Sequence, residues 1–344
     1  MRVTTLPVVA PPDPRRAADG EPLAGPRDIR AVRTLRLSVT DRCNFRCVYC
    51  MPAEKIDWLP RGDLLSFEEI GAVVRAAVSL GIRRFKLTGG EPLARADLPV
   101  LVRILRGFSG VSELSMTTNG SLLDEHAEAL RRAGLDRLTV SLDTLDPHRF
   151  REITRGGDLA RVWAGIAAAR RAGFPHPKIN CVAMRGVNDD EFARFAALTL
   201  ETDLTVRFIE YMPLGRTALG GEYEKRFISE QEIRRAIAPL GPLTAAGDSG
   251  VGPAVTWRLP GAAGRIGFIS AMSRPFCETC NRLRLTATGQ LRSCLFDGGE
   301  VELRPPLRAG AGADALRAAF VRCASFKPQV HGYYGNRQMS QVGG

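Results

Sequence analysis

Three cysteines near the start of the chain have a spacing that suits metal chemistry. Cys43, Cys47 and Cys50 follow the pattern C-x3-C-x2-C on what reads as a single loop. A structural zinc ion normally closes its shell with four ligands, so three thiolates leave a metal incompletely coordinated unless a distant residue completes the shell. An open coordination position is where a cofactor or substrate can bind. A zinc loop is the alternative interpretation.

A second group of three cysteines lies in the last quarter of the chain. Cys277, Cys280 and Cys294 are spaced C-x2-C-x13-C. A zinc ribbon would need a fourth ligand, which Cys323 or His331 could supply. Taken alone, this second group therefore favours zinc.

The two remaining cysteines are predicted to serve packing. Cys181 lies in an apolar strand-like run and Cys323 in a helical one. A free cysteine in such surroundings usually behaves as a small buried hydrophobic residue.

From residue 34 onward, short apolar runs alternate with longer amphipathic stretches, which predicts βα units. The predicted strands are 35–39, 85–88, 113–117, 137–142, 178–183 and 205–209, and the predicted helices are 66–80, 97–108, 124–133, 159–172 and 189–200. Ser66 and Glu69 form a capping-box pattern, and glycines at 81, 134 and 173 stand where helices would stop. Alternating βα units require a parallel sheet, either doubly wound or closed towards a barrel. The pattern does not separate these two folds.

Changes in composition predict three segments. Residues 1–30 are rich in proline without periodicity and read as a disordered leader. The βα alternation occupies 31–214. After Met212 the segments become rich in glycine and proline with shorter strands, so 215–344 is predicted to be an annex.

Composition narrows the class of protein and of partner. The chain has 344 residues, 44% hydrophobic and 25% charged, with a formal net charge of +11. No apolar run is long enough to cross a bilayer, so no membrane association is expected and a cytoplasmic location is predicted. The basic balance favours anionic partners. Because the arginines are scattered and form no dense block, we expect a phosphorylated small molecule and no nucleic acid.

The first cysteine group, with Tyr49 before its last cysteine, resembles the signature of the radical S-adenosylmethionine (SAM) superfamily. Residues 30–344 resemble its GTP 3′,8-cyclase family. The resemblance implies an α/β fold, an incomplete parallel (βα)6 TIM-type barrel with a C-terminal annex. It implies two 4Fe-4S clusters, one holding SAM at its open iron and an auxiliary one on the second cysteine group, whose open iron holds the purine. In this context iron-sulfur displaces zinc as the favoured interpretation of the second group.

The resemblance also implies roles for single residues, each of which alone would read as a turn, a cap, core filler or a surface charge. The implied metal ligands are Cys43, Cys47, Cys50, Cys277, Cys280 and Cys294. The implied SAM contacts are Tyr49, Gly90 in the Gly89-Gly90-Glu91-Pro92 segment, Ser141 and Met212. The implied GTP contacts are Arg36, Lys86, Thr117, Lys178, Arg282, Leu283 and Arg284. The terminal Gly343 and Gly344 are implied to reach into the active site.

The implied reaction is a radical cyclisation. SAM reduced at the first cluster gives a 5′-deoxyadenosyl radical, which takes hydrogen from C3′ of GTP before that carbon attacks C8, the first step of molybdenum cofactor biosynthesis. No side chain acts as a nucleophile. The implied partners are GTP, SAM, an external electron donor and, downstream, cyclic pyranopterin monophosphate synthase, with a homodimer left open. The alternatives are a peptide-modifying radical SAM enzyme with an auxiliary cluster and a zinc-stabilised nucleic-acid-binding protein.

Overall fold

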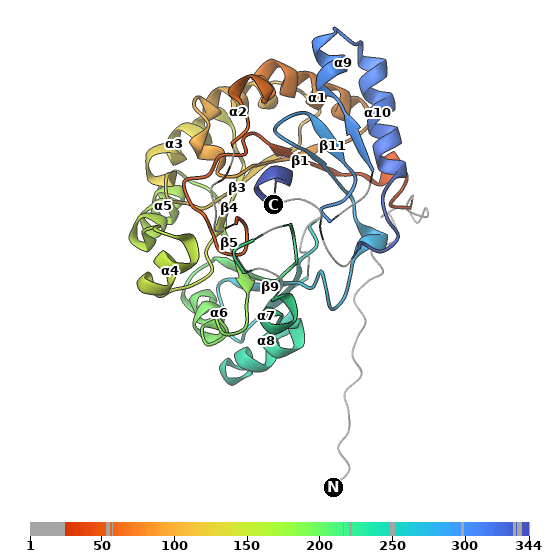
Figure 1. Ribbon diagram of the computed structural model, residues 1–344. Coiled ribbons are helices and arrows are strands. Elements are labelled where there is room, and N and C mark those ends of the chain that lie inside the picture. Colours follow the sequence, from red (N-terminus) through yellow and green to blue (C-terminus); the bar gives the residue numbers. More distant parts are fainter. Residues whose placement is uncertain are drawn as a thin grey trace.

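A computed structural model gives the architecture shown in Figure 1. It describes residues 25–343 except 53–55, 57, 216, 220–221, 248–251, 297–298, 333–334 and 336–338. Gly344 and most of the predicted leader therefore lie outside the described residues. The strands are β1 (Thr34–Ser38), β2 (Arg84–Thr88), β3 (Glu113–Thr118), β4 (Arg137–Ser141), β5 (Lys178–Ala183), β6 (Thr205–Glu210), β7 (Thr244–Ala245), β8 (Val255–Arg258), β9 (Arg265–Ile269), β10 (Arg282–Leu285), β11 (Gln290–Arg292) and β12 (Glu300–Glu302).

Helices cover the outside of the sheet, in an arc that Figure 1 shows around the strands. They are α1 (Phe67–Ser79), α2 (Leu98–Arg106), α3 (Leu123–Ala133), α4 (Pro147–Thr154), α5 (Leu159–Arg171), α6 (Phe192–Glu201), α7 (Tyr223–Arg226), α8 (Glu230–Ile237), α9 (Arg304–Arg308), α10 (Ala313–Ser325) and α11 (Met339–Val342). No helix within the described ranges is long and apolar enough to span a membrane.

The sheet order shows that the fold is an open barrel rather than a doubly wound sheet. The described strands run β12-β11-β10-β1-β2-β3-β4-β5-β6-β9-β8-β7. The six predicted strands form its parallel centre, and two annex strands extend it in parallel, β10 beside β1 and β9 beside β6. No ladder of the described strands joins β9 to β10. Residues 270–281, which connect these two strands in sequence, therefore cross the open side of the barrel.

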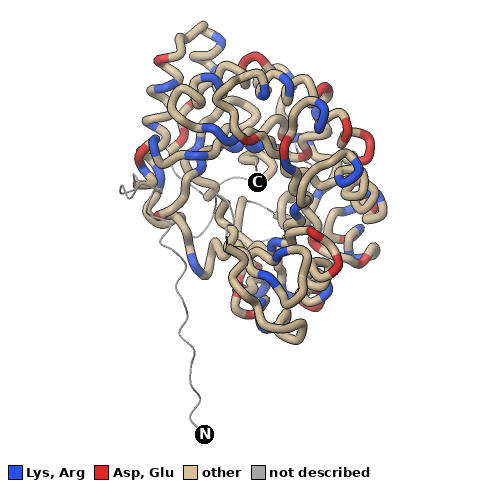
Figure 2. The backbone as a smooth tube through the Cα atoms, turned by 180° about the vertical axis from the view of Figure 1, so that it is seen from behind, with Lys and Arg blue, Asp and Glu red and all other residues tan. Residues whose placement is uncertain are grey.

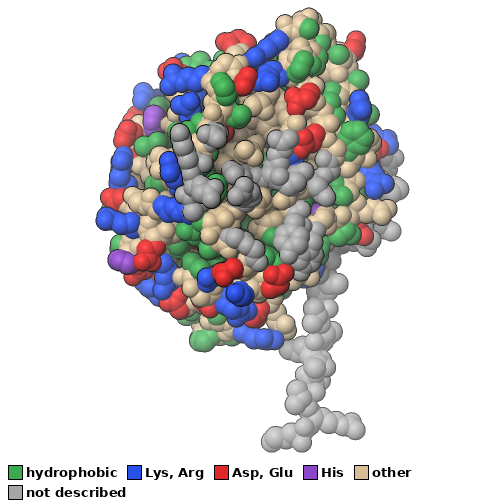
Figure 3. Space-filling model, viewed as in Figure 1, with side chains coloured by type: hydrophobic (Ala, Val, Ile, Leu, Met, Phe, Trp, Pro, Cys, Tyr) green, Lys and Arg blue, Asp and Glu red, His purple; other side chains and the backbone are tan. Residues whose placement is uncertain are grey.

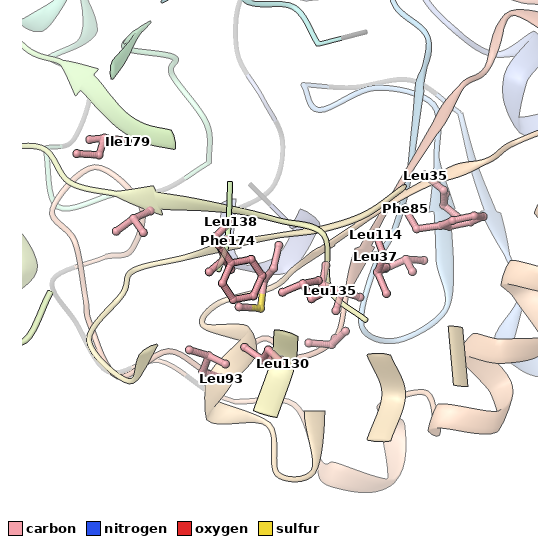
Figure 4. Packing of buried hydrophobic residues seen from close by; sticks show 14 of the residues in the cluster. Leu35, Leu37, Phe85, Leu93, Leu114, Leu130, Leu135, Leu138, Phe174 and Ile179 are labelled. Atoms are coloured by element: carbon pink, nitrogen blue, oxygen red, sulfur yellow. The ribbon is translucent and has the colours of Figure 1, made fainter. Parts of the chain in front are cut away.

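The core lies between the outer face of the sheet and the helices. Leu35, Phe85, Leu114 and Leu138, from four adjacent strands, are at most 1% exposed. In Figure 4, Leu35, Phe85 and Leu114 lie side by side, and Leu138 lies nearer to Leu130 of α3. Because successive strand side chains alternate between faces, burying these residues outward turns their neighbours into the barrel.

Local signals explain where several helices begin and end. Ser66 and Glu69 form the predicted capping box at the start of α1, and Gly134 ends α3 with a φ of +102°. Helix α4 is absent from the sequence-based expectations. Its signal is Asp146, whose side chain caps the helix, followed by Pro147 at the first helical position.

Glu210, at the end of β6, joins the barrel to the annex. Its carboxylate accepts hydrogen bonds from the backbone N–H groups of Glu230 (3.0 Å), Met272 (2.8 Å) and Ser273 (2.8 Å), and from the Ser273 hydroxyl. Met272 and Ser273 belong to the segment that crosses the open side. The buried carboxylate thus fixes the start of the loop that carries Cys277.

We expect Glu210→Gln to destabilise the folded protein. The amide nitrogen of glutamine cannot accept the N–H donors, so the free energy of unfolding should fall by about 1.5–3 kcal/mol. Urea unfolding followed by circular dichroism measures this loss. Glu201→Gln, at an exposed position at the end of α6, is the control. Equal unfolding midpoints for the two variants would contradict this role of Glu210.

Candidate active site

One pocket of about 600 Å³ occupies the interior of the barrel. Its wall is the inner face of the strands, where polar residues alternate with the outward apolar ones. On β3, for example, Glu113, Ser115 and Thr117 line the pocket while Leu114 and Met116 are buried in the core. The lining begins at the first residues of the central strands and continues past their last ones, so the pocket runs along the full length of the barrel.

The basic residues that line this pocket include five that come from five different strands: Arg36 (β1), Lys86 (β2), Lys178 (β5), Arg207 (β6) and Arg284 (β10). Burial lowers the pKa of Lys178 to about 8, of Arg207 to about 10 and of Arg284 to about 9. Burial and neighbouring cations lower the pKa of Arg36 and Lys86 well below their usual ranges. These five cations, called the five-cation wall below, repel one another when the pocket is empty. The pocket therefore suits a polyanion.

Basic residues outnumber acidic ones in the pocket lining, whereas the face that surrounds its mouth carries a mixture of both. Figure 2 shows Lys and Arg on the strands around the centre. On the face seen in Figure 3, basic, acidic and apolar side chains are interspersed, without a large patch of one kind among the coloured residues. This distribution favours a small anion in the pocket over a long nucleic acid on that face.

The first cysteine group lies on the loop that follows β1. Burial is the main cause that raises the pKa of Cys43 and Cys50 to about 12, and the charge of Glu91 adds to the shift of Cys43, as Cys43 adds to that of Cys50. Burial also raises the pKa of Cys47, with Cys50, Asp143 and Cys43 adding to it. The three thiols therefore lie close enough to repel one another once ionised. A shared iron-sulfur cluster would remove this repulsion, because its irons take up the thiolate charge.

Buried polar residues hold this loop in place. The Tyr49 hydroxyl donates to Asp143 (2.8 Å), which burial shifts to a pKa of about 6. Gly90 packs directly on the loop, since a Cβ there would lie 2.3 Å from the carbonyl oxygen of Arg42. Gly90 itself does not line the pocket. Its need for glycine thus comes from contact with the cysteine loop.

The second cysteine group lines the opposite, open side of the barrel. Cys277 and Cys280 lie on the crossing segment and Cys294 follows β11, and all three line the pocket. The charges of Arg282 and Lys327 outweigh the burial of Cys280 and lower its pKa to about 6. Because the thiolate is the form that binds metal, this thiol suits a metal or cluster ligand. His331 lies beside the group, and its backbone N–H is 3.3 Å from Cys277 Sγ.

Neither group is arranged around a single ion. Among the described residues, no three His, Cys, Asp or Glu side chains form a site that could hold one metal ion. All six cysteines are partly exposed and unpaired by disulfides. Their fit to clusters therefore depends on the shared loops, on the interactions between thiols within each group and on the cations beside Cys280.

The remaining predicted contacts divide between lining and supporting positions. Ser141, Met212, Thr117 and Arg282 line the pocket. The Oγ of Thr117 is buried without a hydrogen-bond partner among the residues that the structure describes. Leu283 is fully buried in the core, because alternate residues of β10 face opposite sides. A contact of Leu283 with GTP would therefore have to involve its backbone and not its side chain.

The C-terminal segment returns into the barrel, where Figure 1 shows the chain end among the strands. The carbonyl of Gly343 accepts a hydrogen bond from Arg284 (2.5 Å). Gly343 has a φ of +70°, and a Cβ there would lie 2.5 Å from Thr88 Oγ1. The positive φ and the lack of room for a Cβ both require glycine at this position. Gly344, predicted to accompany it, lies outside the described residues.

We expect Gly343→Ala to reduce product formation by about 10- to 100-fold, because the displaced tail would release Arg284 from its position. Gly310→Ala is a matched control, since Gly310 has a similar φ of +75° but nothing within 4 Å of an added Cβ. Steady-state assays of both variants provide the measurement. Equal activities would contradict a role for the tail contact beyond backbone strain.

Two pocket residues escape the sequence analysis. Arg207 is 9% exposed, and its Nε has no hydrogen-bond partner in the described residues. Its signal is a charge in the middle of an apolar strand, as at Arg36 and Lys86. Asp143 is 5% exposed and supports Tyr49. Its signal is its position just after a strand.

Comparisons with known proteins show the family to which the chain belongs. The sequence model of the Radical SAM superfamily matches residues 37–199, and that of Molybdenum Cofactor Synthesis C matches 204–333. The GTP 3′,8-cyclase of Pelotomaculum thermopropionicum is 50% identical, with 92% of this chain and 98% of that one covered. The GTP 3′,8-cyclase of Pseudomonas syringae pv. syringae is 49% identical, with 91% and 94% covered.

A solved structure supports the fold alone. The crystal structure of Streptococcus suis SuiB bound to S-adenosylmethionine matches with a TM-score of 0.56 and 14% identity, covering 83% of this chain and 68% of that one. The two matched sequence models together cover most of the chain, and the relatives match it almost end to end. This chain belongs to the GTP 3′,8-cyclase family of the radical SAM superfamily.

Proposed function

We propose that this pocket converts GTP into (8S)-3′,8-cyclo-7,8-dihydroguanosine 5′-triphosphate, the first step of molybdenum cofactor biosynthesis. The observation that carries the proposal is the placement of five cations from five strands in one pocket, with a cysteine trio beside it at the loop after β1 and another in its wall. The cations suit a triphosphate. The trios suit two clusters that each keep an open iron.

The cofactors are two 4Fe-4S clusters and SAM. Cys43, Cys47 and Cys50 would hold the first cluster, and Cys277, Cys280 and Cys294 the second. When bound, the first cluster and SAM supply the one-electron chemistry that starts the reaction, and the second cluster supplies an open iron for the base. Every other contribution comes from this chain, which binds, orients and shields the reactants.

We assign the pocket residues by their distance along the barrel from the two trios. Tyr49, Ser141 and Met212 lie at the carboxyl ends of the strands or beyond, beside the first trio, and would contact SAM. Gly90 would support that end through the cysteine loop. The GTP would lie deeper, with its phosphates on the cations of β1, β2, β5, β6 and β10. Thr117, Arg282 and the backbone of Leu283 complete this set.

An anaerobic assay tests the function. Reconstituted protein supplied with GTP, SAM and a reductant should release 5′-deoxyadenosine and the cyclised product in equal amounts. Iron and sulfide should each approach about eight atoms per chain. A preparation that contains zinc without sulfide, or that cleaves SAM independently of GTP without forming product, would contradict the proposal.

The wider setting is also proposed. The one-electron chemistry requires an external electron donor for the first cluster, and the product would pass to cyclic pyranopterin monophosphate synthase. Reduced thiolates suit a cytoplasmic location. A homodimer is compatible with this assignment, and sedimentation of the reconstituted protein distinguishes it from a monomer.

A further inference from the structure

A buried lysine touches the second cysteine group. Lys327 follows α10 and is 2% exposed. Its ammonium nitrogen lies 3.3 Å from Cys280 Sγ and 3.3 Å from the carbonyl oxygen of Ser293. The backbone carbonyl of Lys327 accepts a hydrogen bond from Arg27 Nε (2.9 Å), which ties it to the start of the described chain. The side chain is therefore held against the sulfur from a fixed backbone.

This ammonium needs a negative partner. Burying an ammonium away from water is costly unless it is paired and hydrogen-bonded. In the described part of the chain, no carboxylate forms an ion pair with Lys327, and its polar contacts are the carbonyl of Ser293 and the sulfur of Cys280. The thiolate of Cys280, together with the cluster that Cys277, Cys280 and Cys294 would hold, supplies the negative charge that pairs with this lysine.

The first cysteine group has no equivalent among the described residues. Cys43 Sγ accepts from the backbone N–H of Phe45 (3.4 Å) and from the side-chain amide of Asn119 (3.9 Å), both neutral donors. The buried carboxyl groups Glu91 and Asp143 act on this group, Glu91 on Cys43 and Asp143 on Cys47. The fold thus places a cation against the second group and anions around the first.

We propose that Lys327 is a positioning residue that raises the reduction potential of the second cluster through its charge and its N–H···S contact with Cys280. This inference rests on the proposed function, because it requires a cluster on the second cysteine group. Reduction adds one negative charge to a cluster, and a cation within hydrogen-bond distance stabilises the reduced form more than the oxidised one. Lys327 is not a catalytic residue, since it acts only through Cys280.

The test is a redox titration followed by electron paramagnetic resonance. The background variant replaces Cys43, Cys47 and Cys50 with alanine, so that the full-length protein assembles the second cluster alone. In this background, Lys327→Met should lower the ratio of reduced to oxidised cluster about tenfold at the potential where the parent is half reduced. For a one-electron couple this is about 59 mV. Lys327→Arg keeps the charge and should change the ratio by less than about threefold.

The control is Lys225→Met, at an exposed lysine that pairs with Glu222 on α7. Its titration should match that of the parent. A Lys327→Met titration that matches the control would overturn the inference, as would equal shifts for Lys327→Met and Lys327→Arg, which would indicate packing rather than charge. Should Lys327→Met lose the cluster, retention in Lys327→Arg at the parental potential supports the inference, and loss in both overturns it.

Iron and sulfide measured on the background variant separate this inference from the proposed function. About four of each per chain establish the cluster on the second group. Absence of iron and sulfide in the background variant, while the unsubstituted protein carries about four of each, contradicts the two-cluster function itself. A normal content with an unchanged potential contradicts only the role of Lys327.

Discussion

Replacing Cys47 with serine is expected to abolish SAM cleavage and to remove about half of the iron. Cys47 is the middle cysteine of the first group, and burial together with the other two thiols raises its pKa. A serine hydroxyl is a far poorer iron ligand than a thiolate, so the first cluster should not persist on the two remaining cysteines. The second group lies on other segments and should keep its cluster.

The measurement is iron and sulfide content together with anaerobic release of 5′-deoxyadenosine. Iron should fall from about eight to about four atoms per chain, and 5′-deoxyadenosine to the level without enzyme. Cys323→Ala is the control, since Cys323 is fully buried in α10 outside both groups. It should keep the full iron content, which would also exclude Cys323 as a fourth ligand of the second group. Undiminished SAM cleavage by Cys47→Ser would refute the assignment of the first cluster.

Replacing Arg207 with leucine is expected to weaken GTP binding while stabilising the free protein. Arg207 belongs to the five-cation wall, and it acts on both Arg36 and Lys86, whose pKa values its charge helps to lower. Removing a hydrogen-bonding charge from a bound phosphate costs roughly 1.5–3 kcal/mol, or about 10- to 150-fold in affinity. Without GTP, the same substitution relieves repulsion among the cations that line the pocket.

Two measurements separate these effects. Isothermal titration of GTP should show the weaker binding, and the Tm without GTP should rise by roughly 2 °C for each 1 kcal/mol of repulsion relieved. Arg132→Leu, at a residue whose side chain is 73% exposed on α3, should change neither quantity. A lower Tm accompanied by weaker binding would show that Arg207 supports the fold instead of the substrate.

The helices and strands of the barrel could be predicted because their signals are local. The capping box at Ser66, the glycine stop at Gly134 and the apolar runs of the six central strands depend on neighbours a few residues apart. The prediction missed α4 because its apolar face is short and its start is a single Asp-Pro step. The shape of the sheet could not be predicted from local signals, because β9 pairs with β6 and β10 with β1, which are distant from them in sequence.

The site divides in the same way. The two cysteine groups and the Tyr49 position stand out by their spacing, and the resemblance supplied roles for residues such as Arg36 and Arg284. Arg207 was missed because one arginine in a strand carries no spacing signal. Leu283 was included with its neighbours, although the alternation of β10 turns its side chain into the core. Gly90 has no room for a Cβ because the cysteine loop packs against it, and this contact is visible only in the tertiary structure.

The sequence by itself determined the cysteine trios, the alternation of elements and the basic balance, because each depends on residue type and short-range spacing. Only the tertiary structure decided that annex strands extend both edges of the barrel, that residues 270–281 carry the second trio across its open side, and that Lys327 meets Cys280. These features depend on contacts between segments far apart in the chain. Such contacts form when the helices and the outer face of the sheet bury their apolar surfaces, and the polar inner face is gathered around one pocket as a result.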